Sequence, residues 1–185
     1  EQKERIATLF DLNNIRNNNI AALTRLKELQ QSDGSWAWYK GMNGSRFITN
    51  FIVELNARLA LLTGKPLEGD ALTMQRSAFS FLNKEALEEY KNIRKAEKNG
   101  EKVKGLSDEA LKYLYLVAIS GEKMPLADNQ IAYNYFLSKV GETLTSRSMT
   151  NKALAAIVLD KAGRKQEALN FIASLKEFLT KTDEQ

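Results

Sequence analysis

Apolar residues recur at steps of three, four and seven positions along most of this 185-residue chain. This spacing places them on one face of an α-helix. Glycine, asparagine or proline interrupts the pattern where one helix is expected to end and the next to begin. Residues 1–12 are predicted to form a short amphipathic segment, and residues 13–19 a turn and helix start. The pattern predicts about seven helices, at residues 16–30, 46–63, 70–98, 108–120, 127–140, 146–162 and 165–180.

One of these helices is ambiguous by composition. Residues 113–119 are all apolar or aromatic and would also suit a buried strand. Ser107 is well placed as an N-cap, with Asp108 and Glu109 in the first turn, and Gly121 is well placed as the stop. These end signals favour a helix.

The breadth of the apolar surface differs from helix to helix. The helices at 46–63 and 108–120 are apolar around much of their circumference, so we expect them to be buried on several sides. The others carry narrower stripes, and a joint of about two residues predicts that the last two helices form an antiparallel hairpin. The predicted fold class is all-α, with inner and outer helices in an αα-hairpin superhelix that is part of an α/α toroid. We expect residues 1–185 to form one domain.

The absent residue types restrict the chemistry. The chain has no histidine and no cysteine. A Ser-His-Asp triad, a Cys-His pair, a disulfide and a metal site with His or Cys ligands are therefore excluded within it. No glycine-rich phosphate-binding loop and no metal-binding constellation is evident either. We expect no cofactor, no metal and no catalytic residue.

The charge is mildly basic, with a net charge of +4. The excess is spread out except at residues 91–104, where acidic residues are interspersed and no aromatic occurs. Such mixed charge is typical of a solvated helix face, so no nucleic-acid partner is expected. No apolar run approaches the roughly 20 residues of a membrane span, which argues against direct membrane insertion. The start at Glu1-Gln2, without a signal peptide, is interpreted as a cut inside a much larger multidomain protein.

Residues 29–41 hold both tryptophans of the chain. Asp33 and Gly34 predict a tight turn, in which glycine supplies a positive φ and aspartate caps the local backbone. The aromatic residues after the turn either form a stacking platform for a sugar or peptide or fill the joint between two helices. Packing is favoured, because aromatics after a tight turn usually fill the joint that they follow. The candidate binding residues, which we expect to be mainly structural, are Asp33, Gly34, Trp36, Trp38, Tyr39 and Arg46.

Two other groups of residues are weaker candidates for a catalytic site. Glu85, Glu88 and Glu89 form an acidic cluster, but neighbouring lysines suggest an ordinary charged helix face. Ser146 and Ser148 precede Lys152, and helix capping is a better explanation for them than a Ser/Lys catalytic pair.

The order of these features resembles a segment of the thioester-type domain of bacterial alpha-2-macroglobulins. A leucine-rich helix ends in Leu29-Gln30-Gln31 and is followed by Asp33-Gly34-Ser35-Trp36 and by the threonine-containing apolar helix from Phe47. Residues 152–164, with Ala168 and residues 174–176, resemble the later hairpin of the same domain. The Gln-x-x-Asp-Gly-x-Trp pattern is also similar to the repeat of squalene-type cyclases, which share the α/α toroid.

The resemblance implies a function outside catalysis. Proteins of this family trap proteases by collapsing around them after cleavage of a bait region, and some tether the protease through a Cys-x-Glu-Gln thioester. This chain has no cysteine and forms no thioester. The resemblance thus implies a non-catalytic helical domain that contributes to endopeptidase inhibition at the bacterial cell envelope or in the periplasm. Its expected partners are the other domains of the same protein and, for the full-length protein, proteases.

An alternative is left open by the shared toroid. The chain would then belong to an α/α-toroid enzyme or to a binding module that acts on glycans, isoprenoids or peptides. In that case the aromatic residues after the Asp33-Gly34 turn would form the wall of the binding site.

Overall fold

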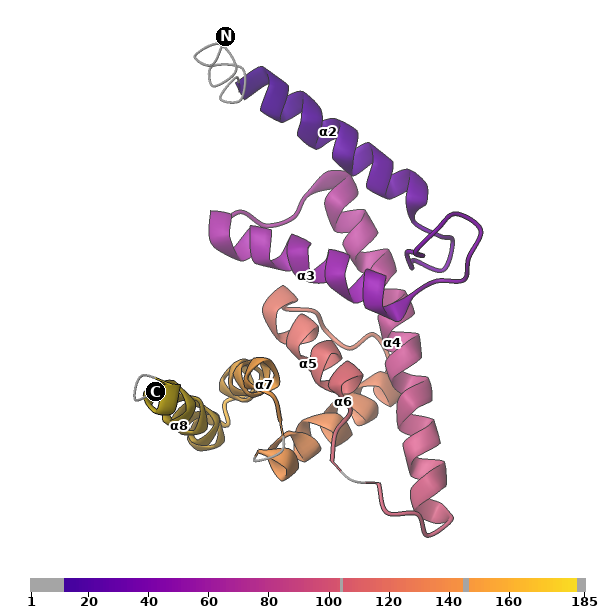
Figure 1. Ribbon diagram of the computed structural model, residues 1–185. Helices are drawn as coiled ribbons and strands as arrows, with labels where there is room; N and C mark the ends of the chain where they lie inside the picture. The colour runs from indigo at the N-terminus through magenta and orange to yellow at the C-terminus, as the bar shows by residue number, and fades with distance from the viewer. Residues whose placement is uncertain (1–11, 104, 145–146, 183–185) are drawn as a thin grey trace.

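The computed structural model describes residues 12–103, 105–144 and 147–182, and these residues are helical or lie in the connections between helices (Figure 1). The predicted all-α class is confirmed. The described helices are α2 (Leu12–Leu29), α3 (Arg46–Thr63), α4 (Gly69–Lys98), α5 (Asp108–Ser120), α6 (Ala127–Lys139), the short 3₁₀ helix η1 (Val140–Thr143), α7 (Met149–Lys161) and α8 (Lys165–Thr182). Within the described ranges, extended pairing is limited to one antiparallel bridge between Trp36 and Ser45.

The predicted helices agree with the observed ones to within about three residues, except at the start of the chain. Residues 13–15 were predicted to lie in a turn, and this is wrong, because α2 already begins at Leu12. The stretch at 113–119 is helical, as its end signals predict. The predicted amphipathic segment at 1–12 lies almost entirely outside the described residues.

Serine N-caps define the starts of three helices. Ser45, Ser107 and Ser148 are extended, and the side-chain oxygen of each accepts a hydrogen bond from the backbone N–H three residues later. Each bond satisfies a donor that has no partner within its helix. The helices α3, α5 and α7 begin at these caps.

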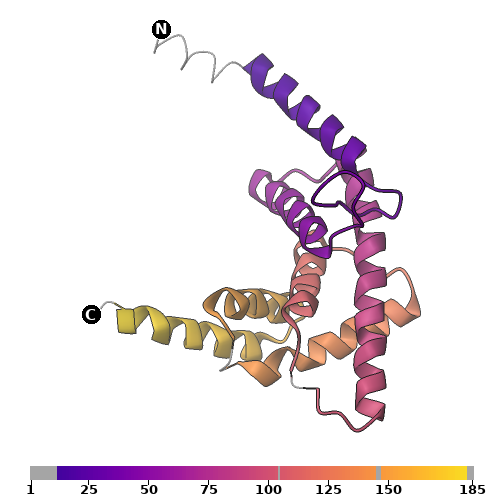
Figure 2. The ribbon, with the colours of Figure 1, turned by 45° about the vertical axis from the view of Figure 1, so that its right-hand side comes forward.

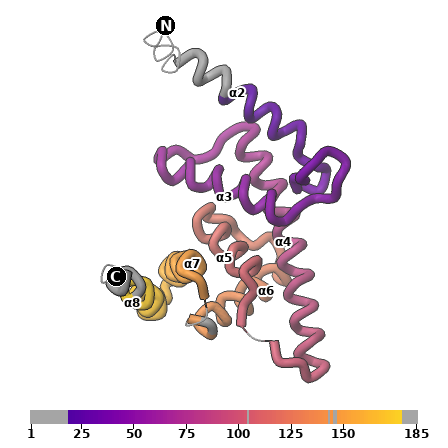
Figure 3. Tube along the Cα trace, viewed as in Figure 1, coloured from indigo at the N-terminus to yellow at the C-terminus, as the bar shows by residue number. Residues whose placement is uncertain are grey.

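The helices make contacts with near neighbours in the chain. α3 contacts α4 and α5, and α5 contacts α7, while α4 contacts α6. The predicted hairpin is present, because α7 packs against α8. Figures 1 and 2 both show α2 extending away from the other helices toward the N-terminus, and Figure 2 shows α8 lying beside α7 and extending toward the C-terminus. The Cα trace in Figure 3 follows the same path, with the long helix α4 running beside α5 and α6.

The core is centred on α5, as its broad apolar surface predicts. Seven of its 13 residues are buried. Leu111, Leu114 and Leu116 have no exposed surface, and they pack in one cluster with residues of α4, α6 and α7.

The expectation that α3 is buried on several sides is wrong. Its buried residues are Thr49, Asn50, Val53 and Ala57. They share one side of the helix, and α4 and α5 are the helices with which α3 makes its main contacts. The other side is exposed, and we call its five large apolar residues the apolar ridge: Phe47, Phe51, Leu55, Leu59 and Leu62.

Candidate functional site

The connection between α2 and α3 contains the predicted Asp33-Gly34 turn. Gly34 has a φ of +91°, and its N–H donates to the carbonyl oxygen of Gln31 at 2.9 Å. The Asp33 carboxylate accepts hydrogen bonds from the Ser35 hydroxyl at 2.6 Å and from the Ser35 N–H at 2.9 Å. The hydroxyl bond is the main reason that the pKa of Asp33 lies below its ordinary value. Both predicted roles, the positive φ and the local cap, are confirmed.

The turn is held against α4. The Gln30 side-chain amide donates to the carbonyl oxygens of Gly34 and Met74, each at 2.9 Å. Gly34 lies so close to α4 that a Cβ atom there would stand 1.9 Å from the carbonyl oxygen of Ser77. Glycine is therefore required at this position by both its conformation and its space.

Trp36 fills the joint between helices. It is 2% exposed, and its indole N–H donates to the carbonyl oxygen of Leu26 at the end of α2, at 2.8 Å. Its backbone N–H donates to the hydroxyl of Thr49 on α3 at 3.0 Å. The preference for a packing role is confirmed for Trp36.

Trp38 and Tyr39 lie on the surface instead. Trp38 is 58% exposed and Tyr39 is 75% exposed. Trp38 stacks on Phe47 of the apolar ridge, with ring centroids 5.6 Å apart and planes inclined by 9°. A cavity of about 390 Å³ is lined by Trp38, Tyr39 and the end of α2. The prediction that Tyr39 fills the joint between helices is therefore wrong. Trp38 also lies outside the joint and extends the apolar ridge.

Arg46 connects α3 to α4 and takes no part in the Asp33-Gly34 turn. Its Nη1 atom forms an ion pair with Glu89 of α4 at 2.7 Å, and Glu89 also accepts a hydrogen bond from the hydroxyl of Ser107. The pair joins the start of α3 to α4 and to the N-cap of α5. Arg46 Nε and Nη2 are buried and have no hydrogen-bond partner among the described residues.

Arg46 also lines a groove that sequence reasoning missed. The groove measures about 530 Å³ and lies between the first halves of α3, α5 and α7, and we call it the α3–α5–α7 groove. The three serine caps mark the starts of these helices, but only the packing brings the starts together. Its lining residues are Arg46, Phe47, Asn50, Phe51, Glu54, Asp108, Glu109, Lys112, Thr150, Asn151 and Leu154.

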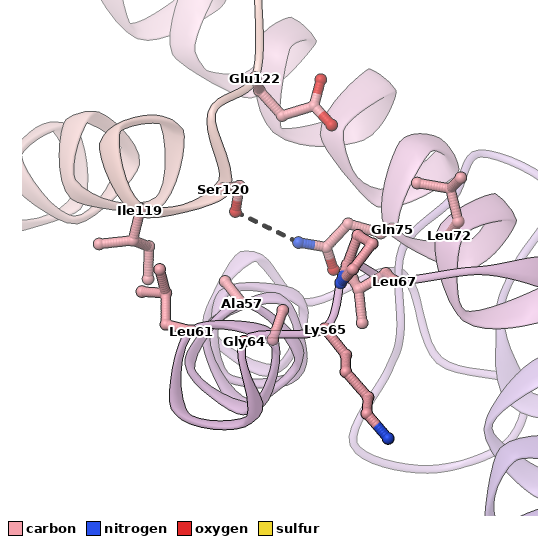
Figure 4. Close-up of a pocket in the computed structure, with 12 residues that line it drawn as sticks. Ala57, Leu61, Gly64, Lys65, Leu67, Leu72, Gln75, Ile119, Ser120 and Glu122 are labelled. Atoms are coloured by element: carbon pink, nitrogen blue, oxygen red, sulfur yellow. Dashed lines mark hydrogen bonds between the residues drawn. The ribbon is translucent and has the colours of Figure 1, made fainter.

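A second cavity of about 460 Å³ lies at the far ends of α3 and α5, next to the start of α4 (Figure 4). Its walls are largely apolar, and the buried Gln75 amide donates to the hydroxyl of Ser120 at 3.3 Å. The ammonium group of Lys65 points away from this pair. The amide is therefore engaged within the fold, between α4 and the end of α5.

The weaker candidates have structural roles. Ser148 caps α7, and the buried Lys152 donates to Ser174 at 2.8 Å, so the suggested Ser/Lys pair is not formed with Ser148. Ser146 lies outside the described residues. Glu88 pairs with Lys91 on the surface of α4, as expected for a charged helix face.

Among the residues that the structure describes, no group of three or more acidic side chains is arranged to hold a metal ion. None of the described helices is both long enough and apolar enough to cross a membrane. Neither a family model, nor a curated protein, nor a solved structure matches the sequence.

Proposed function

We propose that this chain is a non-catalytic helical docking domain, and that its apolar ridge packs against a neighbouring polypeptide. The observation that carries the proposal is the ridge itself. Phe47 is 66% exposed and Leu62 is 86% exposed, and the three residues between them in the ridge are each more than half exposed. Contiguous apolar surface of this kind marks interaction sites, whereas scattered apolar residues do not.

The rigidity of the adjoining turn supports docking. Trp36 and Gly34 fix the turn to α2, α3 and α4, and Trp38 stacks on Phe47 at the end of the ridge. A preorganised aromatic surface loses little conformational entropy on binding. The ridge and Trp38 together therefore present a preformed surface.

The sequence resemblance suggests where such a domain would act. We propose that the chain belongs to an alpha-2-macroglobulin-like protein of the bacterial cell envelope, in which it contributes to protease trapping by packing against sibling domains. The succession of contacts from α3 to α5 to α7, with α4 against α6, supports an αα-hairpin superhelix of the toroid type. The motif Gln30, Asp33, Gly34 and Trp36 is the sequence feature on which the family proposal depends.

The test uses the complete polypeptide that carries this chain. Leu55→Lys combined with Leu59→Lys places two charges on the ridge, and we expect the protein to retain less protease after cleavage. The fold should survive, because both residues are exposed in the domain itself. Retention is measured by size-exclusion chromatography of the cleaved protein with its protease.

The control is Leu126→Lys, a single substitution of an exposed leucine before α6 and outside the ridge. It should leave protease retention unchanged. Equal retention by the ridge variant and the wild type would contradict the docking proposal.

A glycan-binding module is the second candidate, and the exposure of Trp38 and Tyr39 favours it. Aromatic side chains presented to solvent in this way offer an apolar face on which a sugar ring can stack. Trp38→Ala would then abolish binding of cello- or chito-oligosaccharides, measured by titration calorimetry, and leave the fold intact. Docking predicts no oligosaccharide binding by either form.

A further inference from the structure

The cavity of about 460 Å³ at the far ends of α3 and α5 has largely apolar walls (Figure 4), and we call it the end cavity. Its volume falls in the range of sites that bind small molecules. The amide of Gln75 is used within the fold, so recognition of a ligand depends on the apolar walls and on the charge around them. The larger apolar side chains of the lining are Leu61, Leu67, Leu72 and Ile119.

The ends of two helices line the end cavity, α3 with Leu61 and Gly64 and α5 with Ile119 and Ser120. The last carbonyl groups of a helix have no partner within it, and they carry the negative end of the helix dipole. α2, α4, α6 and α7 each have a lysine in the last turn, whereas α3 and α5 have no basic residue there. The two helices that meet at the cavity therefore supply no cation of their own to these negative ends.

An unpaired carboxylate adds to the negative charge. Glu122 lines the end cavity, directly after the residue that caps the end of α5. Its side chain forms no ion pair or hydrogen bond with any described residue. Glu122 is partly exposed, so a bound ligand can reach it. A carboxylate and two helix ends thus favour a positive charge at the edge of an apolar cavity.

The positive charges nearby do not cancel this field. Lys65 is the one basic residue of the lining, and Figure 4 shows its ammonium group and the Glu122 carboxylate on opposite sides of the dashed hydrogen bond. α4 begins beside the cavity and presents the positive end of its dipole, but Glu68 and Asp70 at that end are acidic and offset it.

We propose that the end cavity binds a small molecule that carries a protonated amine on an apolar body. The apolar body packs against Leu61, Leu72 and Ile119, and the ammonium group lies at the edge, beside Glu122 and the carbonyl ends of α3 and α5. An anionic ligand of the same shape would be repelled by the same groups. This site is separate from the apolar ridge, because none of the five ridge residues lines the end cavity.

The test compares three probes that share a phenyl ring and differ in their polar group: 2-phenylethylamine, 2-phenylethanol and 3-phenylpropanoate. Binding to the full chain at neutral pH is followed by NMR of the backbone amides. We expect the amides of Gly64, Ser120 and Gly121 to shift, and the amine to bind about tenfold more tightly than the alcohol. The carboxylate should bind more weakly than the alcohol. This comparison uses the wild type, so it does not depend on how a variant folds.

Glu122→Gln removes the carboxylate and keeps the shape of the side chain. It should lower the affinity for the amine several-fold and leave the affinity for the alcohol unchanged. The fold should survive, because Glu122 is partly exposed and makes no polar contact in the domain. The matched control is Glu85→Gln, since Glu85 is also partly exposed and unpaired but lies on α4 outside the cavity. It should bind all three probes as the wild type does.

Absence of amine binding at millimolar concentrations would overturn the proposal. So would equal affinities for the three probes, shifts that map away from the end cavity, or a Glu122→Gln variant that binds the amine as tightly as the wild type. The ridge variant, with lysines at Leu55 and Leu59, alters neither lining residue nor probe, so the two proposals stand or fall separately.

Discussion

At Gly34 the backbone conformation and the available space impose the same choice of residue. Its φ of +91° is strained for any residue with a side chain, and the carbonyl of Ser77 occupies the place of a Cβ atom. Gly121, at the end of α5, has a similar positive φ of 66° but faces open space. A substitution at Gly121 therefore tests the free-energy cost of the backbone conformation alone. A substitution at Gly34 tests that cost together with the cost of close packing.

Gly34→Ala should destabilise the protein by more than Gly121→Ala does. For Gly121→Ala we expect a loss of about 1–2 kcal/mol, from the left-handed conformation alone. For Gly34→Ala we expect about 3 kcal/mol or more, because the turn must also move away from α4. Urea denaturation of both variants measures the difference, and equal losses would show that the turn does not depend on its contact with α4.

The carboxylate of Asp33 gives the turn a predictable response to acid. Its pKa in the folded state lies below the ordinary value, chiefly because of the hydrogen bond from the Ser35 hydroxyl. A depressed pKa stabilises the fold above the pKa of the unfolded chain, about 3.9, and this contribution is lost as the pH falls through the folded-state pKa. Ser35→Ala should raise the pKa of Asp33, and NMR titration of its carboxyl carbon checks this. An unchanged pKa would show that Ser35 is not the cause.

Among the elements, α5 is joined to its neighbours by polar contacts as well as apolar ones. The Tyr113 hydroxyl donates to Asn83 Oδ1 of α4 at 2.6 Å. Asn129 of α6 donates to the backbone carbonyl of Asn83 at 3.0 Å. Burial raises the pKa of Tyr113, so the hydroxyl keeps its proton and remains a donor. Three helices therefore meet at one buried asparagine.

Tyr113→Phe tests this junction. The variant keeps the ring in the core but leaves the Asn83 oxygen without that donor, so we expect a loss of about 1–3 kcal/mol in unfolding free energy. Tyr39→Phe removes a hydroxyl from an exposed ring and is the control, with an expected change below about 0.5 kcal/mol. Denaturation midpoints measure both, and a neutral Tyr113→Phe would mean that the hydroxyl is not needed at the junction.

At the scale of the whole molecule, stability is distributed unevenly. No side chain described in α2, from residue 19 onward, is fully buried, whereas α5 supplies much of the core. α2 is joined to the remainder mainly through α4 and through the hydrogen bond from Trp36 to Leu26. Elements with few buried contacts open at low free energy.

Hydrogen exchange should therefore distinguish the two helices. Backbone amides of residues 20–27 in α2 should exchange much faster than those of residues 111–117 in α5, when followed by mass spectrometry under native conditions. Comparable protection of both segments would show that α2 is stabilised by contacts as extensive as those of the core.

Short-range features of this chain are determined by its sequence. Helical periodicity, the caps at Ser45, Ser107 and Ser148 and the Asp33-Gly34 turn depend on residues a few positions apart, and each is predictable without knowing the packing. The all-α class follows from them. The start of α2 was mispredicted, because asparagines that commonly form turns are incorporated into a helix there.

Only the tertiary structure decided which surfaces face inward. α3 is apolar around most of its circumference, so periodicity could not show that α4 and α5 would cover one side and leave the ridge exposed. Trp36 and Trp38 are chemically identical, and the contacts with Leu26 and Thr49 bury only the first. The ion pair of Arg46 with Glu89 and the α3–α5–α7 groove join segments 40 or more residues apart in sequence. Such features depend on how the helices pack together, which no local pattern contains.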